Sequence, residues 1–282
     1  MVLFDFSDYN ELIPLVQNSL IAGLLLGLVG GLIGVFVMTR DMSFAVHGIS
    51  ELSFAGAAFA LLLGYNVVGG SIIGSLIAAL IIGYLGAKAK DRNSIVAVLM
   101  PAGLGLGILA LALYEGRAAN KFGLLTGQIV AVDDPQLASL VLICGFVLIT
   151  LLFIWRPLTF ASVDPEVAAA RGVPTKALSI VFMLLLGLAV AASVQIVGAL
   201  LVLSLLVTPA AAALRVSSSP ILTPILSVVF AVTSVIGGIL LALGAGLPIS
   251  PYVTTVSFLI YLVCRVVEKI NGRSNVKAKV NA

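Results

Sequence analysis

Long apolar segments constrain the fold of this chain more than any other feature of its sequence. Segments of about 20 residues, dominated by Leu, Ile, Val, Ala and Gly, follow one another almost to the C-terminus, and one helix needs about 20 apolar residues to cross a bilayer. Charged residues make up only 10% of the 282 residues and hydrophobic residues 61%. A soluble core cannot account for this excess, because a soluble domain must also cover its surface with polar side chains. The sequence therefore predicts an all-α polytopic membrane protein.

Charged residues, Pro and Gly divide the apolar part of the chain into about nine predicted spans. We expect them at residues 12–38, 43–64, 67–87, 94–114, 136–155, 176–192, 197–214, 220–243 and 251–267. These spans leave no room for a soluble catalytic domain. Residues 1–270 are expected to form a single transmembrane domain, and residues 271–282 a basic, flexible cytoplasmic tail.

Some apolar runs contain interruptions. Pro101 and Pro209 lie inside such runs, and residues 194–198 separate two predicted spans with almost no polar loop. We expect broken or re-entrant helices here, which are tolerated at membrane depth only where they face protein or a water-lined path. This favours a transporter or a channel over a simple anchor.

The distribution of Lys and Arg predicts the orientation, because basic residues near span ends stay on the cytoplasmic side. With nine spans, only Arg117 and Lys121 fall on the outer side, whereas an eight-span count would break the alternation at one loop. The N-terminus is therefore expected outside the cell membrane and the C-terminus inside. The predicted cytoplasmic side carries 13 of the 15 basic residues: Arg40, Lys88, Lys90, Arg92, Arg156, Arg171, Lys176, Arg215, Arg265, Lys269, Arg273, Lys277 and Lys279.

Small residues recur at helical spacing in several spans. Close approach of two helix backbones in lipid depends on such spacing. We interpret them as contacts between helices of one bundle, with a dimer seam as the second interpretation. The residues are Gly23, Gly27 and Gly31 on one line, Gly30 and Gly34 beside it, and Gly69, Gly70 and Gly74 in a later span.

His47 and Glu51 are the one strongly ionisable pair within the apolar segments, away from span ends. Their spacing of four places both side chains on one helix face, about one turn apart. Imidazole and carboxylate together bind divalent transition metals such as zinc, manganese or iron. Two ligands do not complete a tetrahedral site, so a metal would also need Ser43, Ser50, water or the same pair from a second protomer. The alternative is that Glu51 holds His47 for structural reasons only.

A second informative segment runs from Asp164 to Pro174. Asp164 suits an N-cap, Pro165 the first helical position and Glu166 the positive end of the helix dipole. Arg171 precedes Gly172, which with the following Pro ends a helix. The segment predicts a helix of about two turns in a cytoplasmic loop, which is either an interfacial connector or a docking helix for a partner protein.

Several functions are excluded by what the sequence lacks. It has no Gly-x-x-x-x-Gly-Lys-Ser/Thr phosphate loop, so this chain does not bind ATP by that route. A Ser, His and Asp triad is not available, because the single His lies in the second span. The net charge of +3 is too small to suggest a nucleic-acid partner. We expect a transport protein that is not an enzyme and takes its energy from another subunit or from an ion gradient.

The residues together resemble the membrane permeases of the ABC-3 family of metal importers, and the resemblance covers nearly the whole chain. The segments that carry it are Arg40 to Phe44, Leu52 to Gly56, Phe122 to Val132, Asp164 to Pro174, Gly198 to Val202 and Thr208 to Ala211. The Arg-x-Met-Ser start and the Gly-Ala-Leu-Leu-Val to Pro-Ala-Ala stretch are the most specific of these segments.

The resemblance implies a type II importer-like permease that works as a homodimer. Two cytoplasmic ATPase subunits would dock at Asp164, Pro165, Glu166, Arg171 and Gly172, and an extracytoplasmic solute-binding protein would deliver the metal. No cofactor would be bound permanently, and the divalent metal would be cargo. In the family the second span usually carries Asp and then His, whereas this chain has His47 and then Glu51. Imidazole and carboxylate are both kept, and the preferred metal stays open.

Three alternatives remain open from the sequence. An ABC permease for an iron chelate or a cobalamin-like cargo would need a wide polar path rather than an ionisable pair. A proton-coupled secondary carrier would use Glu51 and His47 as a relay and would need no ATPase. A membrane scaffold with a purely structural pair is the third alternative.

Overall fold

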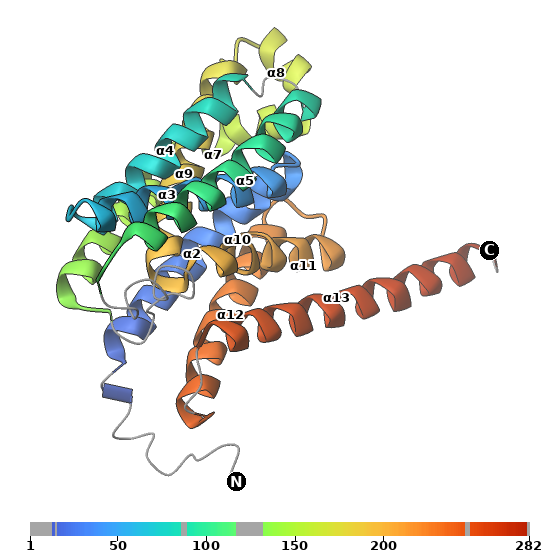
Figure 1. Ribbon diagram of the computed structural model, residues 1–282. Coiled ribbons are helices and arrows are strands. Elements are labelled where there is room, and N and C mark those ends of the chain that lie inside the picture. Colours follow the sequence, from blue (N-terminus) through green and yellow to red (C-terminus); the bar gives the residue numbers. More distant parts are fainter. Residues whose placement is uncertain (1–12, 15, 86–88, 117–131, 246–248, 281–282) are drawn as a thin grey trace.

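The chain forms a bundle of helices, and the computed structural model describes residues 13, 14, 16–85, 89–116, 132–245 and 249–280 (Figure 1). No strand occurs among these residues, so the predicted all-α class is confirmed. The elements are α2 (Gln17–Thr39), α3 (Ser43–Leu62), α4 (Val67–Leu85), α5 (Ala89–Leu113), α7 (Asp134–Val163), α8 (Pro165–Ala170), α9 (Thr175–Val197), the 3-10 helix η2 (Ala199–Leu201), α10 (Val202–Leu206), α11 (Thr208–Val216), α12 (Leu222–Ala245) and α13 (Ile249–Val280).

Seven helices of the described chain are long and apolar enough to cross a bilayer, and each matches a predicted span. They are α2, α3, α4, α5, α7, α9 and α12. The predicted span 251–267 lies within α13, which packs against α11 and α12. The predicted span 197–214 is not one helix, because η2, α10 and α11 divide it.

The two predicted proline interruptions differ in outcome. Pro209 lies in the first turn of α11, where a missing N–H costs no helical hydrogen bond, so the chain is broken there as predicted. The prediction at Pro101 was wrong, because α5 continues through this residue. A single proline removes one hydrogen bond, and a membrane helix can tolerate that loss. Similarly, α7 runs through Pro157 and ends at Val163, beyond the predicted end at residue 155.

Side chains from other helices satisfy the backbone where the chain breaks after α9. The helix ends at Val197, and Gly198 follows with a φ of 87° that favours glycine. The Val197 carbonyl accepts a hydrogen bond from Ser250 Oγ at 3.3 Å, and the Ala199 carbonyl accepts one from Ser50 Oγ at 2.9 Å. Such partners allow irregular backbone inside a membrane protein, since no lipid atom can supply them.

The glycines that recur at helical spacing lie mainly between helices of the same chain, as the first interpretation predicted. Gly23, Gly27 and Gly31 pack against α12, where Ser227 Oγ donates to the Gly31 carbonyl at 2.7 Å. Gly30 and Gly34 approach the backbone of α10. Gly70 and Gly74 lie against α3, whereas a Cβ added at Gly69 would meet nothing within 4 Å in the described structure. Small side chains therefore hold this bundle together by close backbone approach.

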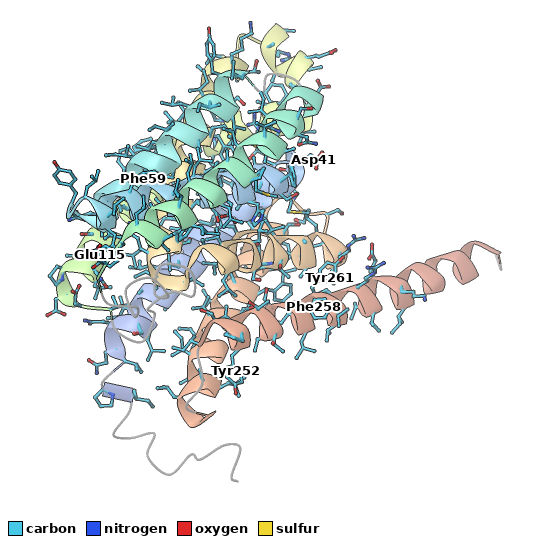
Figure 2. The ribbon with its side chains drawn as sticks, in the orientation of Figure 1. Asp41, Phe59, Glu115, Tyr252, Phe258 and Tyr261 are labelled. Atoms are coloured by element: carbon cyan, nitrogen blue, oxygen red, sulfur yellow. The ribbon has the colours of Figure 1, made fainter. Side chains whose placement is uncertain are left out.

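Residues that are predicted on opposite sides of the membrane lie at opposite ends of the bundle. Asp41 and Glu115 are at the two ends in Figure 2. Asn18 Nδ2, near the outer end of the first predicted span, donates at 2.8 Å to Oδ1 of Asp134, which belongs to a loop predicted outside. Arg40, Arg92 and Lys176, from three predicted cytoplasmic loops, line one cavity. The arrangement agrees with the alternation derived from charge.

Candidate functional site

The candidate site lies on α3, which packs between α4 and α5 and also contacts α9 and α10. Most of α3 is buried, and its small residues allow the neighbouring backbones to come close. Gly56, for example, approaches the backbone of Gly70 and Gly74 in α4, and Ser53 Oγ lies 2.8 Å from Ser71 Oγ. Close contacts of this kind hold α3 firmly and so position the side chains on its remaining face.

His47 and Glu51 lie side by side on this helix, as their spacing predicted. His47 Nε2 is 3.8 Å from Glu51 Oε1, a separation longer than a hydrogen bond. The His47 side chain is 28% exposed and the Glu51 side chain 4%. Phe44, one turn before His47, is also exposed, so this end of α3 has an open face.

Each member of the pair keeps a second polar atom that has no partner in the described part of the chain. His47 Nδ1 and Glu51 Oε2 are both buried and make no hydrogen bond. Buried polar groups are nearly always paired, and exceptions need a reason. An imidazole nitrogen and a carboxylate oxygen are both ligands for divalent transition metals. Ionisable residues inside a membrane mark an ion or proton pathway by default.

The described residues of a single chain do not complete a metal site. No group of three or more His, Cys, Asp or Glu side chains occurs among them. Ser50, one of the two extra ligands considered from the sequence, donates its hydroxyl hydrogen to the Ala199 carbonyl. Ser43 is the first residue of α3, one turn before His47. Among the described residues, one chain therefore offers only the two candidate ligands of the pair.

Gln195 is a polar residue that the sequence reasoning did not select. It lies in α9, three residues before Gly198, and its Nε2 is buried without a hydrogen-bond partner in the described structure. A lone amide in an otherwise apolar span was the available signal. An unsatisfied polar group therefore lies next to the point where α9 ends.

The predicted cytoplasmic helix is present as α8, and its sequence explains both of its ends. Asp164 Oδ1 accepts hydrogen bonds from Glu166 N at 3.1 Å and Val167 N at 2.9 Å, and Pro165 follows in the first turn. At the other end Arg171 is the C-cap, and Gly172 adopts a φ of 82°. The N–H groups of Gly172 and Val173 donate to the Ala169 and Ala168 carbonyls, which is the Schellman pattern.

Only one side of α8 is packed against the rest of the chain. Ala168 is buried against the bundle, while Glu166, Arg171 and Gly172 are exposed. Val163 and Val167 are also exposed, at 81% and 45%. A helix this short does not persist alone, so its packing and its two caps hold it in place. The α8 loop thus presents Val163, at the end of α7, and Val167, in α8, together with charged residues to the predicted cytoplasmic space.

Comparison with known proteins places this arrangement in a family. Residues 12–268 match the ABC 3 transport family. The manganese transport system membrane protein MntC of Halalkalibacterium halodurans is 32% identical over 225 residues, which cover 79% of this chain and 77% of that protein. The high-affinity zinc uptake system membrane protein ZnuB of Haemophilus influenzae is 28% identical over 225 residues, covering 79% and 86%.

A solved structure agrees with the fold over nearly the whole length. PsaBC from Streptococcus pneumoniae, in complex with Fab, superposes with a TM-score of 0.82 and 25% sequence identity. The match covers 92% of this chain and 95% of the other. With its apolar spans, its broken segment after α9 and the match over residues 12–268, the chain belongs to the ABC 3 transport family, as a multi-pass membrane permease.

Proposed function

We propose that this chain is the permease subunit of an ATP-driven importer for a divalent transition metal, with manganese and zinc first and iron next. The observation that carries the proposal is the pair His47 and Glu51, each with a buried atom that lacks a partner among the described residues. The names of the relatives, a manganese system and a zinc system, support the same class of cargo.

The metal would pass between two copies of the chain. One copy offers one imidazole and one carboxylate, and a symmetric pair would offer two of each, enough for a four-coordinate site. The open face beside Phe44 and His47 is consistent with a second copy or a water-lined path at this place. A site assembled across an interface can weaken when the two halves move, which allows release of the ion.

The energy and the cargo would come from partner proteins. An ATPase subunit would dock on the exposed side of the α8 loop, where Val163 at the end of α7 and Val167 in α8 lie near Glu166 and Arg171 in sequence. An extracytoplasmic solute-binding protein would deliver the metal to the opposite end. The metal is cargo, and no cofactor is assigned to the chain.

Uptake into proteoliposomes that contain the permease with its ATPase and binding protein tests this function. We expect ATP-dependent uptake of manganese or zinc as the free ion. Uptake of an iron chelate or a cobalamin without uptake of the free ions would instead identify the organic-cargo permease. Uptake driven by a proton gradient in the absence of the ATPase would identify the secondary carrier.

Asp164→Ala is expected to weaken coupling to the ATPase. The substitution removes the acceptor of two N-terminal N–H groups of α8, at a cost of about 1 kcal/mol to this helix. Co-purification of the ATPase and metal uptake should both fall several-fold, while the melting temperature of the permease alone changes little. The readouts are a pull-down of the ATPase and a thermal melt of the purified permease.

Asp133→Ala provides the matched control. Asp133 caps α7 in the same way, with Oδ1 accepting from Gln136 N at 2.8 Å, but at the opposite end of the bundle. This variant should keep the ATPase bound. Equal loss of the ATPase in both variants would contradict a docking role for α8.

A further inference from the structure

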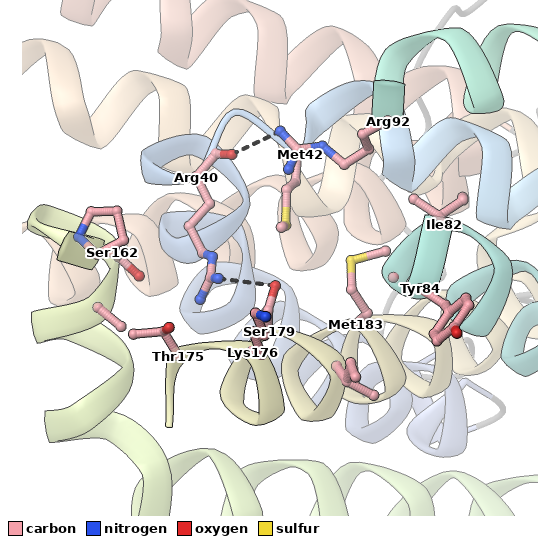
Figure 3. A pocket seen from close by; sticks show the side chains of 14 residues that line it. Arg40, Met42, Ile82, Tyr84, Arg92, Ser162, Thr175, Lys176, Ser179 and Met183 are labelled. Carbon is pink, nitrogen blue, oxygen red and sulfur yellow. Dashed lines mark hydrogen bonds between the residues drawn. The ribbon is translucent and has the colours of Figure 1, made fainter. Parts of the chain in front are cut away.

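A cavity of about 570 Å³ opens at the predicted cytoplasmic end of the bundle. Its walls come from the turn between α2 and α3, the ends of α4 and α7, the start of α5, and the first turns of α8 and α9 (Figure 3). Its volume lies within the range of small-molecule sites, about 300–1,000 Å³. It is separate from His47 and Glu51, neither of which lines it.

The charged residues that line the cavity are all cations. Arg40, Arg92 and Lys176 contribute to its walls, and no Asp or Glu is among its described lining residues. Asp41 and Asp164 each adjoin a lining residue in sequence, and neither lines the cavity. Hydroxyl groups of Tyr84, Thr175 and Ser179 lie among the cations. The lining thus combines positive charge with hydrogen-bond donors.

The two arginines are fixed in place and still have unused donors. Arg92 is only 9% exposed, and its Nη2 donates to the carbonyls of Arg40 at 3.2 Å and Asp41 at 2.9 Å. Arg40 Nη2 donates to Ser179 Oγ at 3.2 Å, and its guanidinium lies 5.5 Å from the centre of the Phe182 ring. Arg40 Nη1 and Arg92 Nε are buried without a partner in the described chain.

Leaving these donors unpaired is costly, since a buried donor without an acceptor loses its full hydration energy. Burial and then the charge of Arg92 lower the pKa of Arg40. An anion in the cavity would offset both effects. The start of α9 adds to this preference, because Thr175 and Lys176 are its first two residues and a helix N-terminus attracts negative charge.

We propose that this cavity binds a phosphate group, held by Arg40, Arg92 and Lys176 with the hydroxyls of Thr175 and Ser179. Phosphate matches the donors, because guanidinium groups pair with its oxygens at fixed geometry. The group is carried either by an anionic lipid headgroup or by a small soluble phosphate. Basic pockets between membrane helices on the cytoplasmic side are suited to lipid headgroups.

The position of the cavity gives the bound group a structural consequence. Pro165, the first residue of α8, lines the same cavity as Arg40 and Lys176. A phosphate there would connect the turn between α2 and α3 with the start of α9, beside the first residue of α8. It would therefore stabilise the surface proposed above for ATPase docking. The binding itself does not depend on metal transport.

The test uses the purified full-length permease in detergent. Phosphatidylglycerol, phosphatidylcholine and glycerol phosphate are titrated separately, with thermal shift and native mass spectrometry as readouts. We expect wild type to retain phosphatidylglycerol in preference to phosphatidylcholine. Arg40→Gln should weaken binding by about tenfold or more, the loss expected for a hydrogen bond to a charged group. Lys176→Gln, at an exposed position, should weaken binding in the same direction with the fold intact.

Lys269→Gln serves as the control, because Lys269 is an exposed cation on α13 outside the cavity. Its binding should equal that of wild type. Binding of glycerol phosphate alone would identify a soluble phosphate as the source, and binding of the anionic lipid alone would identify a headgroup. No preference for either anion, or equal binding by wild type and Lys176→Gln, would overturn the proposal.

Discussion

Glu51→Gln is expected to lower manganese or zinc uptake by at least about tenfold, with the permease still assembled in the membrane. Loss of groups that merely support a metal ligand already costs about 10–100-fold, and this change removes the charge of a proposed ligand. Gln keeps the size of the side chain, which is 4% exposed. Because a buried carboxylate without full pairing is costly, the melting temperature should stay the same or rise.

His47→Ala should give the same loss of uptake, because it removes the only imidazole of the chain. Glu115→Gln is the matched control: this carboxylate is exposed at the opposite end of the bundle from Asp41 and should be dispensable (Figure 2). Initial rates of radioactive metal uptake are compared at equal permease abundance, with thermal melts of the same preparations.

The two readouts together separate the alternatives. Normal uptake in both Glu51→Gln and His47→Ala would remove the pair from the transport path. A lower melting temperature with uptake per folded permease unchanged would identify the structural pair of a scaffold. Neither result would affect the family assignment, which depends on residues 12–268 as a whole.

Gly70→Ala is expected to destabilise the permease strongly by separating α3 from α4. A Cβ at Gly70 would clash with the carbonyl oxygen of Gly56 and with Ala60 Cβ. A carbonyl of a packed helix has no rotamer by which to move away, so the two helices themselves must shift. Overpacking of this kind costs about 1–3 kcal/mol and sometimes more. A thermal melt of the purified permease should show a drop of several degrees.

Gly69→Ala is the control in the neighbouring position. A Cβ at Gly69 would meet no other atom within 4 Å, and alanine favours the helix by about 1 kcal/mol over glycine. This variant should melt at or slightly above the wild-type temperature. Equal destabilisation by the two substitutions would show that the loss comes from glycine itself and not from the α3–α4 contact.

The candidate site was partly predictable because its spacing is local. Two residues four apart in a helix must share a face, so the approach of His47 to Glu51 followed from the sequence alone. The caps of α8 were predictable for the same reason, since Asp164, Pro165 and Gly172 act on backbone within a few residues. That His47 Nδ1 and Glu51 Oε2 have no hydrogen-bond partner among the described residues was not predictable, because it depends on every helix around α3.

The errors in the predicted helices have the same origin. Proline was expected to interrupt the helix at Pro101, yet α5 continues, because a membrane helix tolerates the loss of one hydrogen bond. The interruption predicted at residues 194–198 is present at Gly198. There, serines from α3 and α13 donate hydrogen bonds to the carbonyls that the helix leaves free. Local signals suggest where a helix can end, but the neighbouring side chains decide whether it does.

By itself the sequence determined the class of this protein, its predicted orientation and the two residues of the proposed metal site. These follow from hydropathy, charge and helical spacing, each of which acts over one span or one loop. Only the tertiary structure decided which glycines touch another helix and how Arg40, Arg92 and Lys176 meet around one cavity. Those features join residues that lie far apart in the chain, and only the packing of whole helices brings them together.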